Sequence, residues 1–440
     1  MLLLAGCSAP AANPSSRHWS WPEDPPTDRL GWEAGYWYNE SIHVDQSDGL
    51  NASEREAFVA RTMARVERIR GLEFERPVPV EVVTREKYRN NSSAFSFPHS
   101  AWDEQVWEAL LLVGEDASVN RTFEQLYGGN VLGYYSPSKD SIVVVSDSGE
   151  AVIDRGTLAH ELVHALQDQH FGFTGEPTLD ARYAAQGLTE GDPSLVASMY
   201  QDRCEQGNWS CVPSPGARGS GGGRFNYGVY LTIYQPYSEG PAFVHSLYER
   251  GGWDAVNAAY RNRPASTEQV IHPRKYPDER PVEVTVPDRS AADWHPIDHD
   301  PQVQTVGEGA LFAMFWANGY VTDEQLRSDD SPYSPFNYSY PKTDGWAGDA
   351  VVPYESDAGE YGYVFRTEWD TTADARQFAK AYRAMLQLRQ GATRAEGPGE
   401  TLVVADGPFA DAFRVVRDGR TVTVVNAPTV EALDSVHRFD

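Results

Sequence analysis

The sequence predicts an α+β fold in three parts: a small mixed sheet with a histidine-bearing helix, a mainly helical region, and a small α+β module at the C-terminus. Three patterns support this prediction. Two apolar runs joined by a turn precede the helical stretch 156–173, which holds three histidines. Beyond Asp180 the pattern is mostly helical, and from Tyr361 onward strand-like and helix-like stretches alternate.

The first elements are a helix, a strand and a second helix. Residues 49–72 place apolar side chains on one helical face, and Ser53 and Glu56 have the spacing of a capping box. Residues 77–83 alternate as a strand does, and residues 101–113 form a second helical pattern. We therefore expect a helix–strand–helix start.

A hairpin comes next and leads directly into the histidine helix. Two apolar runs flank Ser136–Lys139, a sequence typical of a turn. The helix with the histidines is expected to begin near Val152. The chain therefore reads strand, hairpin and then the histidine helix.

The middle of the chain is predicted to be helical. Residues 180–203 form one helix or two, because Pro193 would kink or restart it. Further helices are expected over residues 238–252, 266–276 and 306–320. Gly251 and Gly252 would end the first of these, and Ser266 would cap the second.

The C-terminal module is predicted from alternating elements. The expected strands cover residues 361–369, 401–405, 413–416 and 422–425, with a helix over 372–388 and a short helix at the end. Asp418 and Gly419 supply a hairpin turn between the last two strands.

The charge of the chain limits its partners. The formal net charge is −27 over 440 residues, and only five positions are lysine. Such a chain is not expected to bind nucleic acid or an anionic membrane surface. Concentrated salt screens self-repulsion, so we expect a protein adapted to high salt. The mean hydropathy of −0.52 and the lack of a long apolar run argue against a membrane span.

The N-terminus resembles a lipoprotein signal. Residues 4–7, Leu-Ala-Gly-Cys, look like a lipobox, in which Cys7 would carry the lipid anchor. Only six residues precede Cys7 and none is basic, so we expect the true start to lie upstream. A polar tether follows at once. These features predict an extracellular protein held at the cell surface by lipid alone.

Two further features fit an extracellular location. Cys204 and Cys211 could close a small disulfide loop, the alternative being two free thiols. Glycosylation sequons begin at Asn39, Asn51, Asn91, Asn120, Asn208 and Asn337.

The chemistry is concentrated in the H-E-x-x-H pattern of residues 160–164. Four helical steps turn about 400°, so His160 and His164 lie on one face, one turn apart. That spacing suits two ligands on one tetrahedral zinc ion. Glu161 projects away from His160 and could take a proton from a zinc-bound water. A surface helix with solvated histidines is the plainer alternative.

The third zinc ligand has two main candidates. His170 completes the metzincin spacing, but Gln167 replaces the glycine that lets the chain turn back. Glu190 lies 26 residues after His164 within a helical stretch, as the gluzincin pattern requires. Gly191 would allow close helix approach, and Asp192 could hold a ligand histidine. Lesser alternatives are Glu176 and Asp180.

Residues 130–192 resemble the core of a gluzincin-type zinc metallopeptidase, and the whole chain resembles poorly characterised haloarchaeal surface lipoproteins. The resemblance implies that His160, His164 and Glu190 bind zinc and that Glu161 is the general base. Zincins of this type often add an oxyanion-stabilising Tyr or His. Tyr237 is our candidate, with Tyr234, His245 and His272 as alternatives.

The expected function is a secreted, surface-anchored zinc metallopeptidase that acts on peptides or proteins. Two alternatives are a non-catalytic cell-surface binding or envelope protein on a zincin scaffold, and a zinc hydrolase acting on a non-peptide bond. We expect residues 1–30 to be a signal remnant and tether. Residues 31–350 would form the zincin-like domain with its helical subdomain, and residues 351–440 the C-terminal module.

Overall fold

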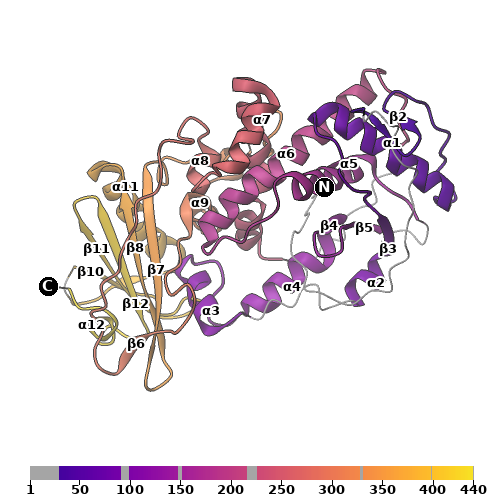
Figure 1. Ribbon diagram of the computed structural model, residues 1–440. Coiled ribbons are helices and arrows are strands. Elements are labelled where there is room, and N and C mark those ends of the chain that lie inside the picture. The colour runs from indigo at the N-terminus through magenta and orange to yellow at the C-terminus, as the bar shows by residue number, and fades with distance from the viewer. Residues whose placement is uncertain are drawn as a thin grey trace.

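The computed structural model describes residues 29–90, 99–146, 151–215, 225–327, 331–397 and 399–439. Cys7, the tether and the sequon at Asn91 lie outside these ranges. Helices and strands are mixed in the α+β manner predicted, and the described strands form three sheets. Figure 1 shows the helices in the middle, a small sheet at one end and the largest sheet at the other.

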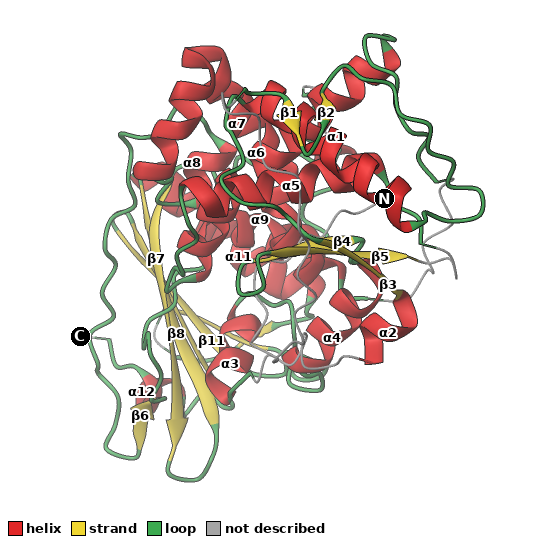
Figure 2. Cartoon of the chain, turned by 45° about the vertical axis from the view of Figure 1, so that its right-hand side comes forward, coloured by secondary structure: helices red, strands yellow, loops and turns green. Residues whose placement is uncertain are grey.

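The small sheet has the edge strand that positions the site. β3 is parallel to β5, and β4 pairs antiparallel with the other side of β5. β4 is therefore an edge strand, and it lies beside the histidine helix α5 (Figure 2). The elements up to this point are β1 (Trp32–Glu33), β2 (Tyr36–Trp37), α1 (Ala52–Arg70), β3 (Val80–Thr84), α2 (Arg85–Asn90), α3 (Ala101–Ala109), α4 (Val119–Asn130), β4 (Gly133–Ser136) and β5 (Ser141–Ser146).

The cap of α1 differs from the sequence prediction. Asn51 is the N-cap: its side chain accepts from the Glu54 N–H, and the Glu54 carboxylate accepts from the Asn51 N–H. The predicted capping box of Ser53 and Glu56 is wrong, because Asn51 offers the same chemistry two residues earlier.

The helical middle contains the longest elements. They are α5 (Arg155–His170), α6 (Leu179–Glu205), α7 (Tyr227–Arg261), α8 (Thr267–Ile271), α9 (Gly307–Ala317) and α10 (Asp323–Leu326). α5 begins after its N-cap Asp154, slightly later than predicted. α6 continues through Pro193 without a break. In α7, Gly251 and Gly252 leave helical geometry, as their sequence predicts.

The C-terminal sheet is antiparallel and has the strand order β6-β7-β8-β12-β11-β10-β9. Its elements are β6 (Trp294–Pro296), β7 (Trp346–Ser356), β8 (Tyr361–Trp369), α11 (Thr372–Arg389), β9 (Thr393–Arg394), β10 (Glu400–Val403), β11 (Ala412–Asp418), β12 (Thr421–Ala427) and α12 (Leu433–Val436). β8 has its predicted bounds, and a two-residue turn with Gly419 at φ 57° joins β11 to β12. β6 and the first five residues of β7 precede residue 351, where the predicted module begins, so the sheet is larger than that module.

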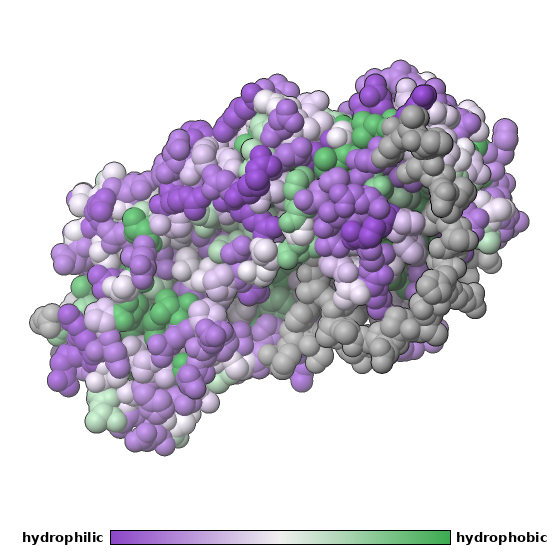
Figure 3. All heavy atoms as spheres, in the orientation of Figure 1, coloured by the Kyte–Doolittle hydropathy of each residue, from purple (hydrophilic) through white to green (hydrophobic). Residues whose placement is uncertain are grey.

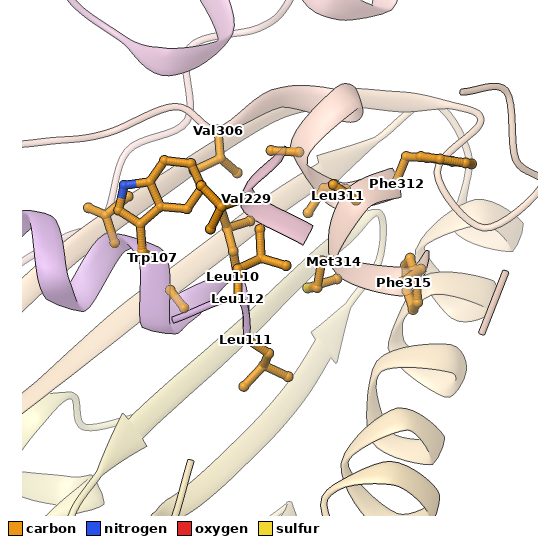
Figure 4. Close-up of a cluster of buried hydrophobic side chains, with 14 of the residues drawn as sticks. Trp107, Leu110, Leu111, Leu112, Val229, Val306, Leu311, Phe312, Met314 and Phe315 are labelled. Carbon is orange, nitrogen blue, oxygen red and sulfur yellow. The ribbon is translucent and has the colours of Figure 1, made fainter. Parts of the chain in front are cut away.

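One apolar core joins the helices to this sheet. Its members include Phe365 of β8 and Phe378 of α11 as well as helical residues. Figure 4 shows part of it, where Trp107 and Leu110–Leu112 meet Val229, Val306, Leu311, Phe312, Met314 and Phe315. In the described part of the chain, no helix has both the length and the apolar character needed to cross a membrane.

A disulfide closes the end of α6. Cys204 in the last turn of the helix is bonded to Cys211 in the following loop. The loop carbonyl of Ser210 accepts from the Arg65 guanidinium at 2.9 Å, and this ties the loop to α1.

Candidate metal centre

Three donor atoms converge between α5 and α6. His160 Nε2 lies 3.2 Å from His164 Nε2, and each nitrogen lies 3.3 Å from Glu190 Oε2. A tetrahedral zinc ion with bonds of 2.0–2.1 Å holds its ligands roughly 3.3 Å apart. The three atoms thus form the triangle that such an ion requires. All three side chains are at least 98% buried, so solvated histidines on a surface helix are excluded.

Two close glycine contacts set the position of α6. A Cβ on Gly191 would lie 2.2 Å from the Gly240 carbonyl oxygen of α7. A Cβ on Gly240 would lie 2.3 Å from the carbonyl oxygen of Gly187. No side chain fits at either distance, so the two helices touch backbone to backbone. The close approach predicted for Gly191 is therefore made with α7, and it fixes the helix that carries Glu190.

Gln167 orients His164 directly. His164 Nδ1 lies 2.9 Å from Gln167 Oε1, and Gln167 Nε2 donates to the Thr189 carbonyl at 2.9 Å. That carbonyl would normally accept from the N–H four residues later, but Pro193 has none. The proline therefore leaves the Thr189 oxygen open to the Gln167 amide.

Asp192 supports Gln167 and does not contact His164 directly. The Tyr260 hydroxyl lies 2.7 Å from Gln167 Nε2 and donates to Asp192 Oδ2 at 2.8 Å. The other oxygen of Asp192 accepts from Arg70 Nε at 2.8 Å, in an ion pair that is almost fully buried. Asp192 thus supports His164 through Gln167 and Tyr260. The direct contact expected from the sequence is wrong, because Gln167 occupies that position.

Glu161 points toward the edge strand β4. Its carboxylate accepts a hydrogen bond from the Tyr135 backbone N–H. Within the described chain, its Oε2 is buried and has no hydrogen-bond partner. Burial raises the pKa of Glu161, although the nearby histidines 160 and 164 act in the opposite direction. One oxygen is therefore fixed by backbone while the other is open to a further proton donor.

Tyr135 also fastens β4 to α5. Its hydroxyl lies 2.6 Å from Asp140 Oδ1 and 2.8 Å from Asp168 Oδ2. Asp168 belongs to α5 and Asp140 to the hairpin turn. The Tyr135 N–H faces Glu161, and the hydrogen bonds of the Tyr135 hydroxyl therefore hold that N–H in place.

Mutual contact sets the pKa values of Glu190 and His164. Burial alone would raise the pKa of Glu190, but His164 and His160 lower it to about 2. Burial alone would lower the pKa of His164, but Glu190 raises it to about 9. A proton on His164 balances the carboxylate at neutral pH, and a zinc ion would replace that proton.

The other predicted ligands point elsewhere. His170 Nε2 lies 2.7 Å from the Glu73 carbonyl oxygen, at the far end of α5. Asp180 Oδ1 accepts from the N–H and hydroxyl of Thr267 at 2.7 and 2.6 Å. Glu176 faces Arg263, at 3.9 Å. The structure brings none of these three side chains into the cluster of residues 160, 164 and 190.

The oxyanion candidates are distributed over α7 and its surroundings. The half-buried ring of Tyr237 stacks on Tyr234 at 5.9 Å. His245 packs against Tyr333, with ring centroids 4.5 Å apart. His272 belongs to a second cluster, described below. The role of Tyr237 in catalysis stays a prediction.

One tyrosine near the cluster was not selected from the sequence. Burial raises the pKa of Tyr127 in α4, and the charges of Tyr183 and Glu190 contribute to its electrostatic environment. Tyr127 therefore lies within electrostatic reach of Glu190. Nothing in its local sequence, "EQLYGG", distinguishes it from a core tyrosine.

The fold and the site together define an α+β protein with a buried cluster of two histidines and one glutamate. A family model described as "Domain of unknown function (DUF8575)" matches residues 295–437. This range covers the C-terminal sheet and excludes the cluster on α5 and α6. No curated protein and no solved structure matches the chain.

Proposed function

We propose that this chain is a gluzincin-type zinc metallopeptidase that hydrolyses peptide bonds in extracellular peptides or proteins. The observation that carries the proposal is the triangle of donor atoms from His160, His164 and Glu190, with sides of 3.2–3.3 Å. Hydrogen bonding favours the same assignment. Gln167 Oε1 accepts from His164 Nδ1, so the Nε2 atom of a neutral His164 presents a lone pair to the cluster.

Glu161 has the environment of a general base. A zinc ion held by His160, His164 and Glu190 would act as a Lewis acid, which lowers the pKa of water to about 7. The open Oε2 of Glu161 would take a proton from the attacking water and would later pass it to the leaving amine. The raised pKa of this carboxyl group suits the first step, because a group of higher proton affinity takes the proton more readily.

The order of elements supports the zincin assignment. The edge strand β4, its partner β5 and the metal-binding helix α5 follow one another in the chain, and β4 lies against α5. In zincins an edge strand runs beside the active cleft. Gly133 of β4 is closely packed on this helix, since a Cβ there would lie 3.1 Å from Thr157 Cγ2.

An extracellular, lipid-anchored location fits the same proposal. The Cys204–Cys211 disulfide is typical of an oxidising compartment. Cys7 would carry the lipid. Hydrophilic side chains cover most of the face in Figure 3, as expected of a chain with a net charge of −27.

A peptide-library digest at molar salt tests the proposal, with wild type and Glu161→Gln compared at equal zinc content. Wild type should cleave peptides, a chelator should stop cleavage, and added zinc should restore it. Glu161→Gln should keep its zinc and lose at least about 100-fold in rate, because the proton acceptor is gone. Glu176→Gln removes a carboxylate outside the cluster and should leave the rate unchanged.

Two outcomes would count against a peptidase. Normal cleavage by Glu161→Gln would refute the role of the base. Zinc-loaded wild type that cleaves no peptide would favour the alternatives, a surface-binding protein on the same scaffold or a zinc hydrolase acting on a non-peptide bond.

A further inference from the structure

A second cluster of ligand-type side chains lies away from α5. His272, Glu308 and Asp344 each offer one donor atom, and these atoms all lie within 4.8 Å of one another. His272 Nε2 is 3.2 Å from each carboxylate oxygen of Glu308 and 3.4 Å from Asp344 Oδ1. These separations match the roughly 3.3 Å expected between two ligands of one tetrahedral zinc ion.

The three residues come from three elements. His272 ends α8, Glu308 lies in the first turn of α9, and Asp344 belongs to the loop before β7. The side chains of His272 and Glu308 are 9% and 0% exposed, whereas that of Asp344 is 47% exposed. The cluster is thus built on buried helix ends and is open to solvent on the side of Asp344.

Glu308 Oε1 accepts from the Thr343 hydroxyl at 3.2 Å and Asp344 Oδ1 from the Ser339 hydroxyl at 3.4 Å, but these hydrogen bonds leave one buried oxygen of the cluster unsatisfied. His272 Nε2 carries at most one proton, yet three carboxylate oxygens lie within 3.4 Å of it. The buried Oε2 of Glu308 has no hydrogen-bond partner in the described part of the chain. A shared cation would satisfy the nitrogen and both carboxylates together, which one proton cannot do.

Lys275 is a neighbouring cation that carboxylates outside the cluster engage. Its ammonium group lies 2.6 Å from Glu268 and Glu279 and 3.5 Å from Asp370.

We propose that His272, Glu308 and Asp344 form a second divalent-metal site, selective for zinc or a similar borderline ion. One imidazole and two carboxylates are a ligand set that suits zinc. The site shares no residue with the first cluster, so it does not depend on the peptidase proposal. Bound metal would join α8 and α9 to the loop that enters the C-terminal sheet, and its role is structural.

Zinc stoichiometry tests the second site. The full chain is stripped with chelator, dialysed at molar salt against free Zn²⁺, and analysed by mass spectrometry for zinc per chain. Wild type should hold two equivalents, His272→Gln one, and His160→Gln one. His295→Gln is the matched control and should hold two, because His295 faces the single carboxylate of Glu355 at 3.3 Å and is half exposed.

Equal zinc content in His272→Gln and wild type would overturn the second site. If His160→Gln loses one equivalent of zinc and His272→Gln loses none, only the second site is refuted. If His272→Gln loses one equivalent and His160→Gln loses none, only the first site is refuted. Asp344→Asn provides an independent variant if His272→Gln does not fold, because residue 344 is half exposed. In the His160→Gln background, Zn²⁺ should raise the melting temperature, and Asp344→Asn should remove that shift.

Discussion

His164 Nδ1 and Gln167 Oε1 lie 2.9 Å apart within one turn of α5. The Thr189 carbonyl can only accept, so the Gln167 amide nitrogen must face it and the amide oxygen must face His164. His164 Nδ1 therefore carries the proton. A backbone carbonyl that Pro193 leaves unpaired thus determines which nitrogen of the histidine can bind metal.

Gln167→Leu should weaken zinc binding by about 10- to 100-fold, the range typical for loss of a group that orients a ligand histidine. Competition with a chromophoric chelator measures the affinity. Gln169→Leu is the matched control on the same helix, because Gln169 contacts the backbone of Glu75 and Arg76 instead. Equal affinities for the two variants would show that Gln167 does not position the ligand.

Gly191→Ala should destabilise the fold, because its Cβ would lie 2.2 Å from the Gly240 carbonyl and α6 would have to move away from α7. We expect a loss of about 1–3 kcal/mol or more in the free energy of unfolding. Zinc affinity should also fall, since Glu190 moves with the helix. Gly175→Ala, where a Cβ meets nothing within 4 Å, should leave the free energy of unfolding measured in urea unchanged. Equal stability of both variants would contradict the close helix contact.

The free energy of unfolding should depend on pH through the titration of Glu67 in α1. Burial and the neighbouring Glu33 raise the pKa of Glu67 from 4.5 to about 9. A carboxyl pKa raised by folding contributes stability that is complete below about pH 4.5 and is lost as the pH rises toward 9.

Glu33→Gln tests this, because an amide can donate to Glu67 at any pH. Between pH 5 and pH 8.5 the variant should lose less unfolding free energy than wild type, by on the order of a few kcal/mol. Glu56→Gln changes an exposed residue in α1, the helix of Glu67, and its pH profile should match that of wild type. Parallel pH profiles for all three proteins would show that Glu33 does not control the titration of Glu67.

The local features of the site could be predicted from the sequence. The spacing of His160, Glu161 and His164 requires only helical geometry, and Glu190 follows from its place on the next helix. The strand 361–369 and the turn at Asp418 were also predictable, because alternation and turn residues are local signals.

Features that depend on distant contacts could not be predicted. The role of Gln167 is one of these, because its partner is a carbonyl on another helix. β7 was missed because almost every residue of it is buried, so it lacks the alternation of a half-exposed strand. His272, Glu308 and Asp344 are far apart in the chain and share no local pattern.

We propose that His160, His164 and Glu190 share one zinc ion. Anomalous X-ray diffraction at the zinc edge, on crystals of the full chain grown with Zn²⁺, tests it most directly. We predict a peak within about 2.0–2.2 Å of the two Nε2 atoms and one Glu190 oxygen. A peak beside His170, or no peak between α5 and α6, would contradict the account.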